Sequence, residues 1–219
     1  MQFSPSDGSL LERDQIADAR TQLCWLCSRD PSKLNCCELS GGTLKSLSEN
    51  LSDSFVAPLF WYVLLGPLGA IGYRIANTMD SRIGYRGKYE WFGKASSLHD
   101  DLINILPARI TALLLAFVAV FVRGCDARRG LRTAWEDCTQ CDSPNAGCHM
   151  ACFAGILGVR LSKEGQYCLG SGGVDPGPGN LRAGNGVALI AGGMAVLVAT
   201  LAAACDDQAT YALGHCSDC

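Results

Sequence analysis

The chain is 219 residues long, which is enough for one domain and at most two. Apolar residues make up 48% of it, charged residues only 18%, and the mean hydropathy is +0.15, a balance that excludes a long disordered acidic or basic chain. The net charge is −3, so there is no uniform basic surface to hold nucleic acid, and no nucleic-acid partner is expected.

Cysteine is frequent, at 13 residues, and because this count is odd at least one thiol has no partner within the chain. The first residues show no basic stretch followed by an apolar run, so no secretory signal is predicted. Most cysteines are therefore expected to be reduced, and many to serve as small apolar side chains. The polar start resembles the middle of a helix, so we expect a further segment upstream of Met1.

Apolar residues gather in blocks, and the first block covers residues 54–73. It is uncharged over 20 residues between Asp53 and Arg74. A helix of that length rises about 30 Å, which is the thickness of a bilayer core. Pro58 and Pro67 within it are tolerated in membrane bundles. Aromatic residues suited to anchor at the membrane interface are Phe60, Trp61, Tyr62 and Tyr73.

Two further blocks follow, at 102–122 and 183–205. Arg109 interrupts the second block, and its charge should face protein or water. Together the blocks favour an all-α fold, a multi-pass membrane helical bundle with about three transmembrane helices and polar helical loops, whose partner is the lipid bilayer. The alternative is a soluble protein with three buried core helices, although a soluble helix normally shows a polar face.

Four polar clusters flank these blocks, and the first is the stretch 48–53. Glu49 and Asp53 are four residues apart, so on a helix they share one face beside Asn50. Such paired carboxylates form a Mg²⁺ or polar-ligand site. The alternative is a helix N-cap at Ser52 or Asp53.

The second cluster combines Asn77 and Asp80, at i and i+3, with Arg82, Arg86 and Lys88. Carboxylates alternating with cations suit a ligand that carries Mg²⁺ and phosphate. The alternative is a helix C-terminus whose basic residues meet the helix dipole.

The third cluster is His99-Asp100-Asp101, followed by Asn104 and Arg109. Adjacent carboxylates at the mouth of an apolar helix are expected to ligate a metal ion or to pair with Arg109. The alternative is a solvated turn at the membrane interface.

The fourth cluster is the stretch 143–147, SPNAG, which follows an arginine-rich segment. Pro144, Asn145 and Gly147 predict a shaped turn whose free backbone N–H groups could bind an anion.

Three CxxC pairs, Cys24–Cys27, Cys138–Cys141 and Cys216–Cys219, raise the alternative of a soluble zinc protein with His149 and His215 as further ligands. The pairs lie more than seventy residues apart, and apolar blocks separate them. Close pairs also arise by chance in a Cys-rich chain.

Taken in order, these clusters resemble the CobD/CbiB family of cobalamin biosynthesis. The resemblance rests on ENLSD, APLFWY, NTMDS with GYR, FG-A, DDL-N-PAR, and SPNAG with AG-LGV, over 46–115 and 143–161. Weaker matches run from about Arg29 to Gly170. On this basis we divide the chain into a polar N-terminal segment (1–28), a CobD/CbiB-like membrane domain (29–205) and a Cys-rich C-terminal tail (206–219).

The resemblance implies an adenosylcobinamide-phosphate synthase, an amide-forming ligase that joins adenosylcobyric acid to aminopropanol or its phosphate with ATP and Mg²⁺. It implies a corrinoid as substrate and other corrinoid-pathway proteins as partners. The expected catalytic residues are Glu49, Asp53, Asp80 and Asp101. The expected metal ligands are Asp80, Asp100 and Asp101. The expected substrate-binding residues are Asn50, Asn77, Arg82, Arg86, Arg109, Ser143 and Asn145.

The sequence departs from the family at two places. The family usually has further membrane helices ahead of the stretch that matches here, and Cys148 and His149 replace its usual aromatic residue and proline after SPNAG. A second interpretation is therefore a non-catalytic membrane protein that binds a corrinoid precursor or supports a partner enzyme.

Overall fold

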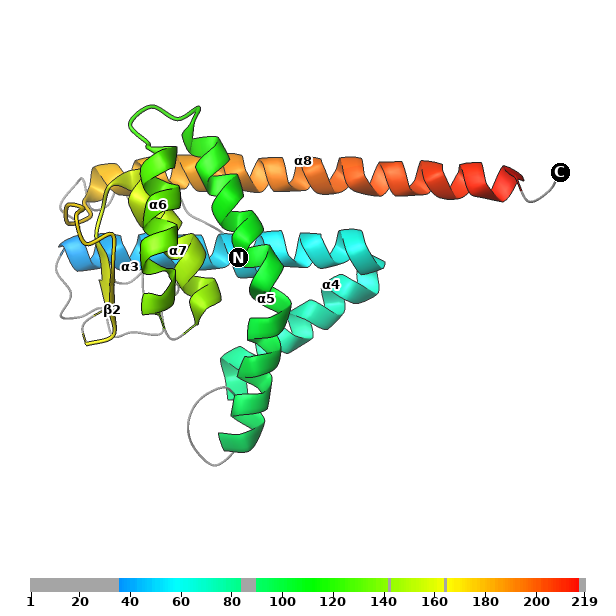
Figure 1. Ribbon diagram of the computed structural model, residues 1–219, viewed down its shortest axis with the longest axis horizontal. Helices are drawn as coiled ribbons and strands as arrows, with labels where there is room; N and C mark the ends of the chain where they lie inside the picture. The colour runs from blue at the N-terminus through cyan, green and yellow to red at the C-terminus, as the bar shows by residue number, and fades with distance from the viewer. Residues whose placement is uncertain (1–35, 84–89, 142, 164, 217–219) are drawn as a thin grey trace.

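The computed structural model describes the backbone of residues 36–83, 90–141, 143–163 and 165–216. Side chains are described over the same ranges, except at residues 83, 90–92 and 206–216. The described chain is almost wholly helical (Figure 1), as the sequence predicts. In chain order the elements are α3 (Cys36–Leu51), the π-turn η2 (Ser52–Val56), α4 (Ala57–Ile83), α5 (Glu90–Ala119), α6 (Ala127–Asp137), the 3-10 turn η3 (Cys138–Gln140), α7 (Pro144–Leu157), β1 (Leu161–Lys163), β2 (Tyr167–Leu169) and α8 (Pro178–Cys216). The two short strands pair antiparallel.

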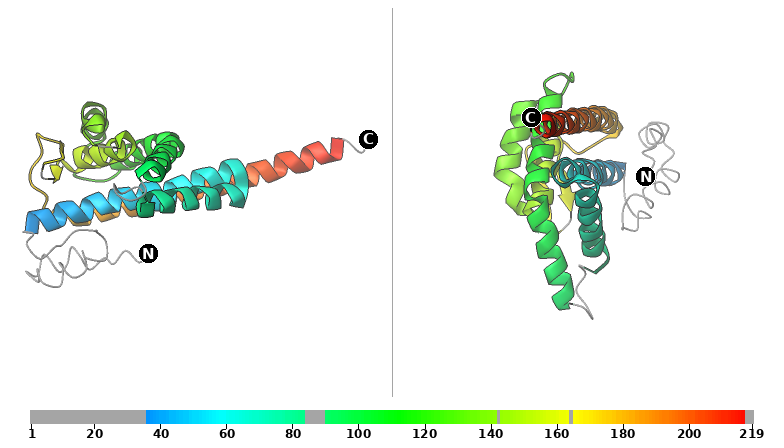
Figure 2. Two further views of the ribbon diagram at one scale, coloured as in Figure 1. Left: turned by 90° about the horizontal axis from the view of Figure 1, so that it is seen from below. Right: turned by 90° about the vertical axis from the view of Figure 1, so that its right-hand side faces the viewer.

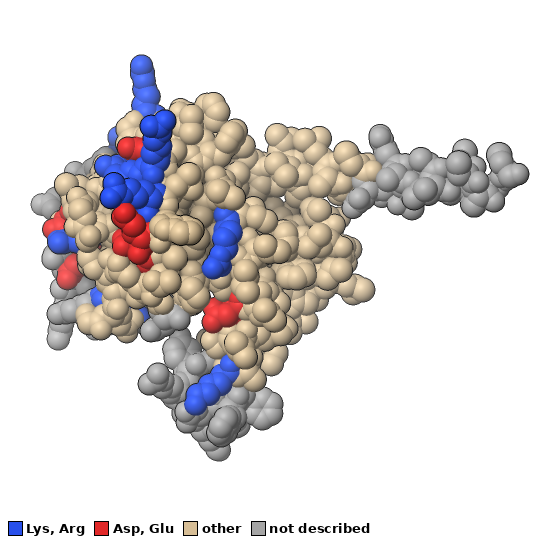
Figure 3. Space-filling model, viewed as in Figure 1, with Lys and Arg blue, Asp and Glu red and all other residues tan. Residues whose placement is uncertain are grey.

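Three helical stretches are long and apolar enough to cross a membrane, namely Cys36–Arg82, Gly93–Ala119 and Pro178–Cys205. They cover the three apolar blocks except for residues 120–122, so the prediction of about three transmembrane helices is confirmed at the level of length and composition. Charged side chains gather instead over α6, while the surface toward the exposed part of α8 is free of them (Figure 3).

The first block differs from its prediction, because it is not one straight helix. Gly66 has φ of 66° and ψ of −158°, and the chain reverses there (Figures 1 and 2). Glycine adopts a positive φ without steric cost, and the ring of Pro67 prevents the preceding helix from continuing undisturbed. The two ends of the block therefore meet: Arg74 Nη1 donates to the backbone oxygen of Asp53 at 3.3 Å.

Helix α7 forms the centre of the fold. Met150, Phe153 and Ile156 are fully buried, and α7 packs against α6, α5, α3 and α8. Gly130 and Gly155 let α6 approach it closely, because a methyl group at either position would overlap the facing helix.

Helices α3 and α8 lie side by side, and α5 runs across them (Figures 1 and 2). A Cβ at Gly184 would touch Leu44, and one at Gly192 would lie 3.6 Å from Phe55, so small residues set the closeness of the pair. The crossing of α5 brings its first turns against α4, where the polar residues gather.

Candidate functional site

Four aspartates, Asp53, Asp80, Asp100 and Asp101, come together where η2, α4 and α5 meet; we call them the carboxylate cluster. Asp53 interacts electrostatically with Asp100, and Asp100 with both Asp80 and Asp101. The charged groups that act on Asp80 and Asp100 in the described part of the chain are these other carboxylates. Negative charges gathered in this way favour a bound cation or a proton, and at Asp53 the charge of Arg74 already offsets part of the repulsion.

Amide side chains orient the central carboxylate of the cluster. Asn77 Nδ2 donates to Asp100 Oδ1 at 3.4 Å, and Asn104 Nδ2 donates to Asp100 Oδ2 at 3.0 Å. The Tyr73 hydroxyl in turn donates to Asn104 Oδ1 at 2.9 Å. Tyr73 is only 3% exposed, so the prediction that it anchors at a membrane interface is wrong: it supports the Asp100 network instead.

The fourth member, Asp101, joins α5 to the start of α7. The Ser143 hydroxyl donates to Asp101 Oδ1 at 2.7 Å, and Asn145 Nδ2 donates to the Asp101 backbone oxygen at 2.6 Å. Arg109 donates to Asn145 Oδ1 and, at 3.1 Å, to the backbone oxygen of Ile105. Of the residues expected to bind substrate, Ser143 and Asn145 therefore bind Asp101, and Arg109 reaches it only through Asn145.

The stretch SPNAG does not form the predicted shaped turn. Ser143 occupies the N-cap position of α7, Pro144 stands in its first turn, and Gly147 N donates to Ser143 O at 3.0 Å. Proline at this position is favoured because its missing N–H would be unpaired there anyway. The Asp101 carboxylate thus lies at the positive end of the α7 dipole.

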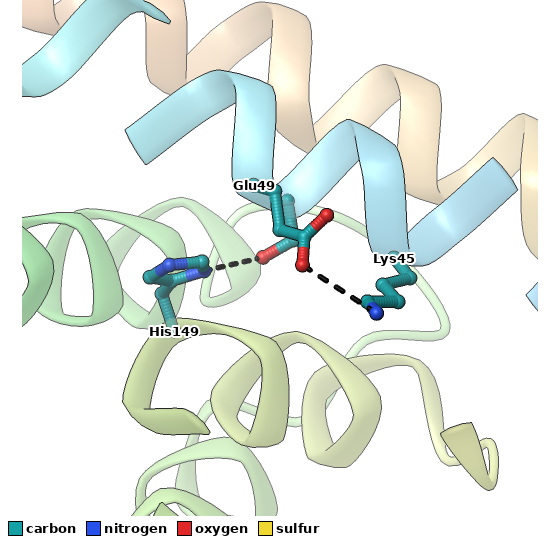
Figure 4. Close-up of polar contacts among 4 residues, drawn as sticks. Lys45, Glu49 and His149 are labelled. Atoms are coloured by element: carbon teal, nitrogen blue, oxygen red, sulfur yellow. Dashed lines mark hydrogen bonds and ion pairs between the residues drawn. The ribbon is translucent and has the colours of Figure 1, made fainter. Parts of the chain in front are cut away.

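Glu49 stands on α3 one turn before Asp53 and interacts electrostatically with it. Lys45 Nζ lies 3.6 Å from Glu49 Oε1. The preceding residue, Ser48, has its Oγ 2.9 Å from His149 Nδ1 on α7 (Figure 4). Ser48 and His149 are each 1% exposed. Sequence reasoning missed this pair: His149 stood out only through its closeness to cysteines and its departure from the family pattern.

The remaining predicted residues fall in different surroundings. Asn50 is half-buried on α3, Arg82 is exposed in the last turn of α4 where it meets the helix dipole, and Arg86 lies outside the described residues. The alternative of an N-cap at Ser52 or Asp53 is wrong, because both lie inside a continuous helix with a π-turn. The alternative of an interfacial turn at 99–101 is wrong as well, because α5 runs through it.

Among the described residues, no group of three or more His, Cys, Asp and Glu side chains is placed to hold a metal ion. The nine cysteines whose side chains are described are free. Of the CxxC pairs, only Cys138–Cys141 lies in the part with described side chains. Mg²⁺ is commonly bound by one or two carboxylates together with the phosphates of a substrate, and the oxygen donors of Asp80 and Asp100 fit that mode.

The chain matches one protein family and several curated proteins over most of its length. The family model described as CobD/Cbib protein matches residues 7–185. "Cobalamin biosynthesis protein CobD" of Dehalococcoides mccartyi is 45% identical over 161 residues, 74% of this chain and 52% of the relative. "Probable cobalamin biosynthesis protein CobD" of Methanocaldococcus jannaschii is 37% identical over 166 residues, 75% of this chain and 54% of the relative. The chain thus spans about half the length of these curated relatives, and no solved structure matches it.

Proposed function

Because the chain belongs to the CobD/CbiB family of cobalamin biosynthesis, we propose that it is an integral membrane ligase that forms an amide bond on a corrinoid. The acid substrate is adenosylcobyric acid, and the amine is aminopropanol or its phosphate. The observation that carries this proposal is the carboxylate cluster: motifs far apart in the sequence bring four aspartates and two orienting amides to one place.

Amide-bond formation requires carboxylates of the kind that this cluster provides. A propionate carboxylate becomes an amide only after activation, most simply by phosphorylation, and MgATP would supply the phosphoryl group and neutralise its charge. The amine attacks the carbonyl carbon, the phosphate leaves, and the amine gives up a proton. One carboxylate near the amine therefore serves as general base, while its neighbours favour a cation.

We propose the following division of the residues between these tasks. Asp80 and Asp100 are the proposed metal ligands, because their charged neighbours are carboxylates and Asn77 and Asn104 orient Asp100. Asp53, with Glu49 one turn before it, is the proposed general base. Asp101, which was predicted as a further metal ligand, is proposed instead to hold α5 against α7 through Ser143 and Asn145, because no three such side chains among the described residues are placed to share one ion.

Arg109, which donates a hydrogen bond to Asn145, is proposed to bind the phosphate or carboxylate group of the substrate. Arg82 is exposed at the end of α4, where it is available to the same ligand. We keep Asn50 and Arg86 as proposed substrate-binding residues on the resemblance alone.

The test is product formation by the full chain in membranes. Incubation with adenosylcobyric acid, aminopropanol phosphate and MgATP should give the amide, detected by mass spectrometry. Asp80→Asn should lower the rate by roughly 100-fold or more. Asp175→Asn is the matched control, because Asp175 lies in an exposed ion pair with Arg160 and should leave the rate unchanged.

Absence of amide with the unaltered chain would contradict the ligase. If that chain still retains the corrinoid on gel filtration, followed by corrinoid absorbance, the non-catalytic binding role is the better account.

A further inference from the structure

We propose that residues 54–73 form a re-entrant hairpin that enters and leaves the bilayer through the same face, with its tip among lipid acyl chains. This arrangement is independent of the reaction proposed above. It contrasts with a straight transmembrane span, which would place Asp53 and Arg74 on opposite sides of the membrane.

The reversal at Gly66 provides the first argument. The outgoing leg runs to Leu65, the returning leg starts at Pro67, and Arg74 donates to the Asp53 backbone oxygen at 3.3 Å. The two charged residues that bound the block thus meet at one end of the hairpin. A methyl group at Gly69 would overlap the Trp61 carbonyl oxygen, so the legs also pack tightly at the other end.

The length of the legs provides the second argument. Residues 54–65 continue α3 without a break, so the returning leg decides how deep the hairpin can reach. This leg has only seven uncharged residues, 67–73, before Arg74, and rises about 10 Å over them. A bilayer core is about 30 Å thick, so the returning leg cannot cross it.

The third argument is the exposed apolar surface of the hairpin tip, which suits contact with lipid acyl chains. Leu64, Leu65, Leu68 and Ile71 are 57%, 62%, 80% and 56% exposed, and no charged residue interrupts residues 54–73. A soluble protein rarely leaves such a contiguous apolar patch uncovered. A shallow, open hollow of about 470 Å³ with a mostly apolar lining continues along one side of the returning leg; it is lined by Ala70, Ile71, Arg74, Ile75, Thr78 and Met79.

The tip sequence lowers the cost of a reversal in lipid. Such a reversal is costly where it leaves N–H and carbonyl groups unpaired, and Pro67 has no N–H to leave unpaired.

Sidedness is tested with a membrane-impermeant maleimide on the full chain in right-side-out and in inverted vesicles, with modified sites read by peptide mass spectrometry. Native Cys37, exposed at the start of α3, marks the side from which the hairpin starts. Ser81→Cys, at an exposed position near the end of α4, marks the side to which it returns. Both thiols should react in the same vesicle preparation. Reaction of residue 81 in the opposite preparation, or in neither, would overturn the proposal.

Lipid contact is tested on the unaltered chain with a phospholipid that carries a photoactivatable diazirine on its acyl chain. Adducts are expected on Leu64, Leu65 and Leu68, and not on Leu44 or Leu47, which are buried on α3. If the residues at the tip yield no adducts, another protein surface or a second copy of this chain covers the tip. The proposal that lipid acyl chains contact it would then be wrong.

Discussion

Ser48 and His149, which are 101 positions apart, form a hydrogen bond of 2.9 Å that joins α3 to α7 in the interior of the fold (Figure 4). Burial, assisted by the positive charge of Arg109, lowers the pKa of His149 from 6.5 to about 3. The imidazole is therefore neutral at physiological pH and serves as a hydrogen-bonding partner, not as a charge.

The first prediction is that acid destabilises the fold through His149. The folded pKa lies below the unfolded one, so the contribution to stability is complete above pH 6.5 and is lost as the pH falls toward 3. Each pH unit in that window costs up to about 1.4 kcal/mol. Thermal unfolding in detergent from pH 7.5 to 4.5 measures this. The slope should be shallower in His149→Gln, and equal slopes would contradict the assignment.

The second prediction concerns the link between Asp101 and Asn145. Asn145 donates to both the backbone and the carboxylate of Asp101, at 2.6 and 3.3 Å, so the side chains should be energetically coupled. A double-mutant cycle with Asp101→Ala and Asn145→Ala should give a coupling of about 1–2 kcal/mol in the free energy of unfolding. Strict additivity would mean that the Asp101 carboxylate adds nothing to the bond that Asn145 makes with the Asp101 backbone oxygen, which the alanine variant keeps.

The third prediction uses two glycines in helices. At Gly155 a Cβ would lie 2.7 Å from the Arg129 backbone oxygen and 2.8 Å from the Gly130 Cα, so Gly155→Ala should force α6 away from α7 and destabilise by about 1–3 kcal/mol. At Gly186 nothing lies within 4 Å, so Gly186→Ala should be neutral or stabilise by up to about 1 kcal/mol. Melting temperatures of the two variants give the comparison, and a similar loss in both would show that close packing of α6 is not the cause.

The fourth prediction is that Mg²⁺ stabilises the chain through Asp80 and Asp100. A ligand that binds only the folded state and is present at about 100 times its Kd adds about 2.7 kcal/mol to the free energy of unfolding. For a chain of this length, that raises the Tm by roughly 5–10 °C. MgCl2 should raise the Tm of the unaltered chain and of the control Asp175→Asn. Asp80→Asn should melt higher than the unaltered chain without Mg²⁺, because it relieves repulsion with Asp101, and should respond less to the ion. An undiminished response would place the metal elsewhere.

The parts of this structure that the sequence predicts are those with a local cause. A lipid-facing helix has a long apolar stretch, so the blocks at 102–122 and 183–205 predict α5 and α8 even though Arg109 interrupts the first of them. The motifs that carry the acidic residues belong to one family pattern, which is why the grouping of Asp53, Asp80 and Asp100 could be expected before any coordinates.

The parts that the sequence does not predict depend on distant contacts. A Gly–Pro pair is compatible with a mild kink as well as a full reversal, and the packing of α4 on α5 selects the reversal seen at Gly66. Trp61 illustrates this packing: its Nε1 donates to the Ile103 carbonyl oxygen at 3.3 Å. The pairing of Ser48 with His149 leaves no local trace either, because each residue alone is unremarkable in a helix.

The central place of α7 has a consequence for how the protein is made. Translation delivers α3 and α5 well before residues 144–157, yet Ser48 on α3 and Asp101 on α5 find their partners on α7 and at its N-cap. Until that helix leaves the ribosome, these polar groups must be satisfied by water, by the translocation machinery or by a chaperone. The helices α3 and α5 can therefore form these polar contacts only after α7 has been synthesised.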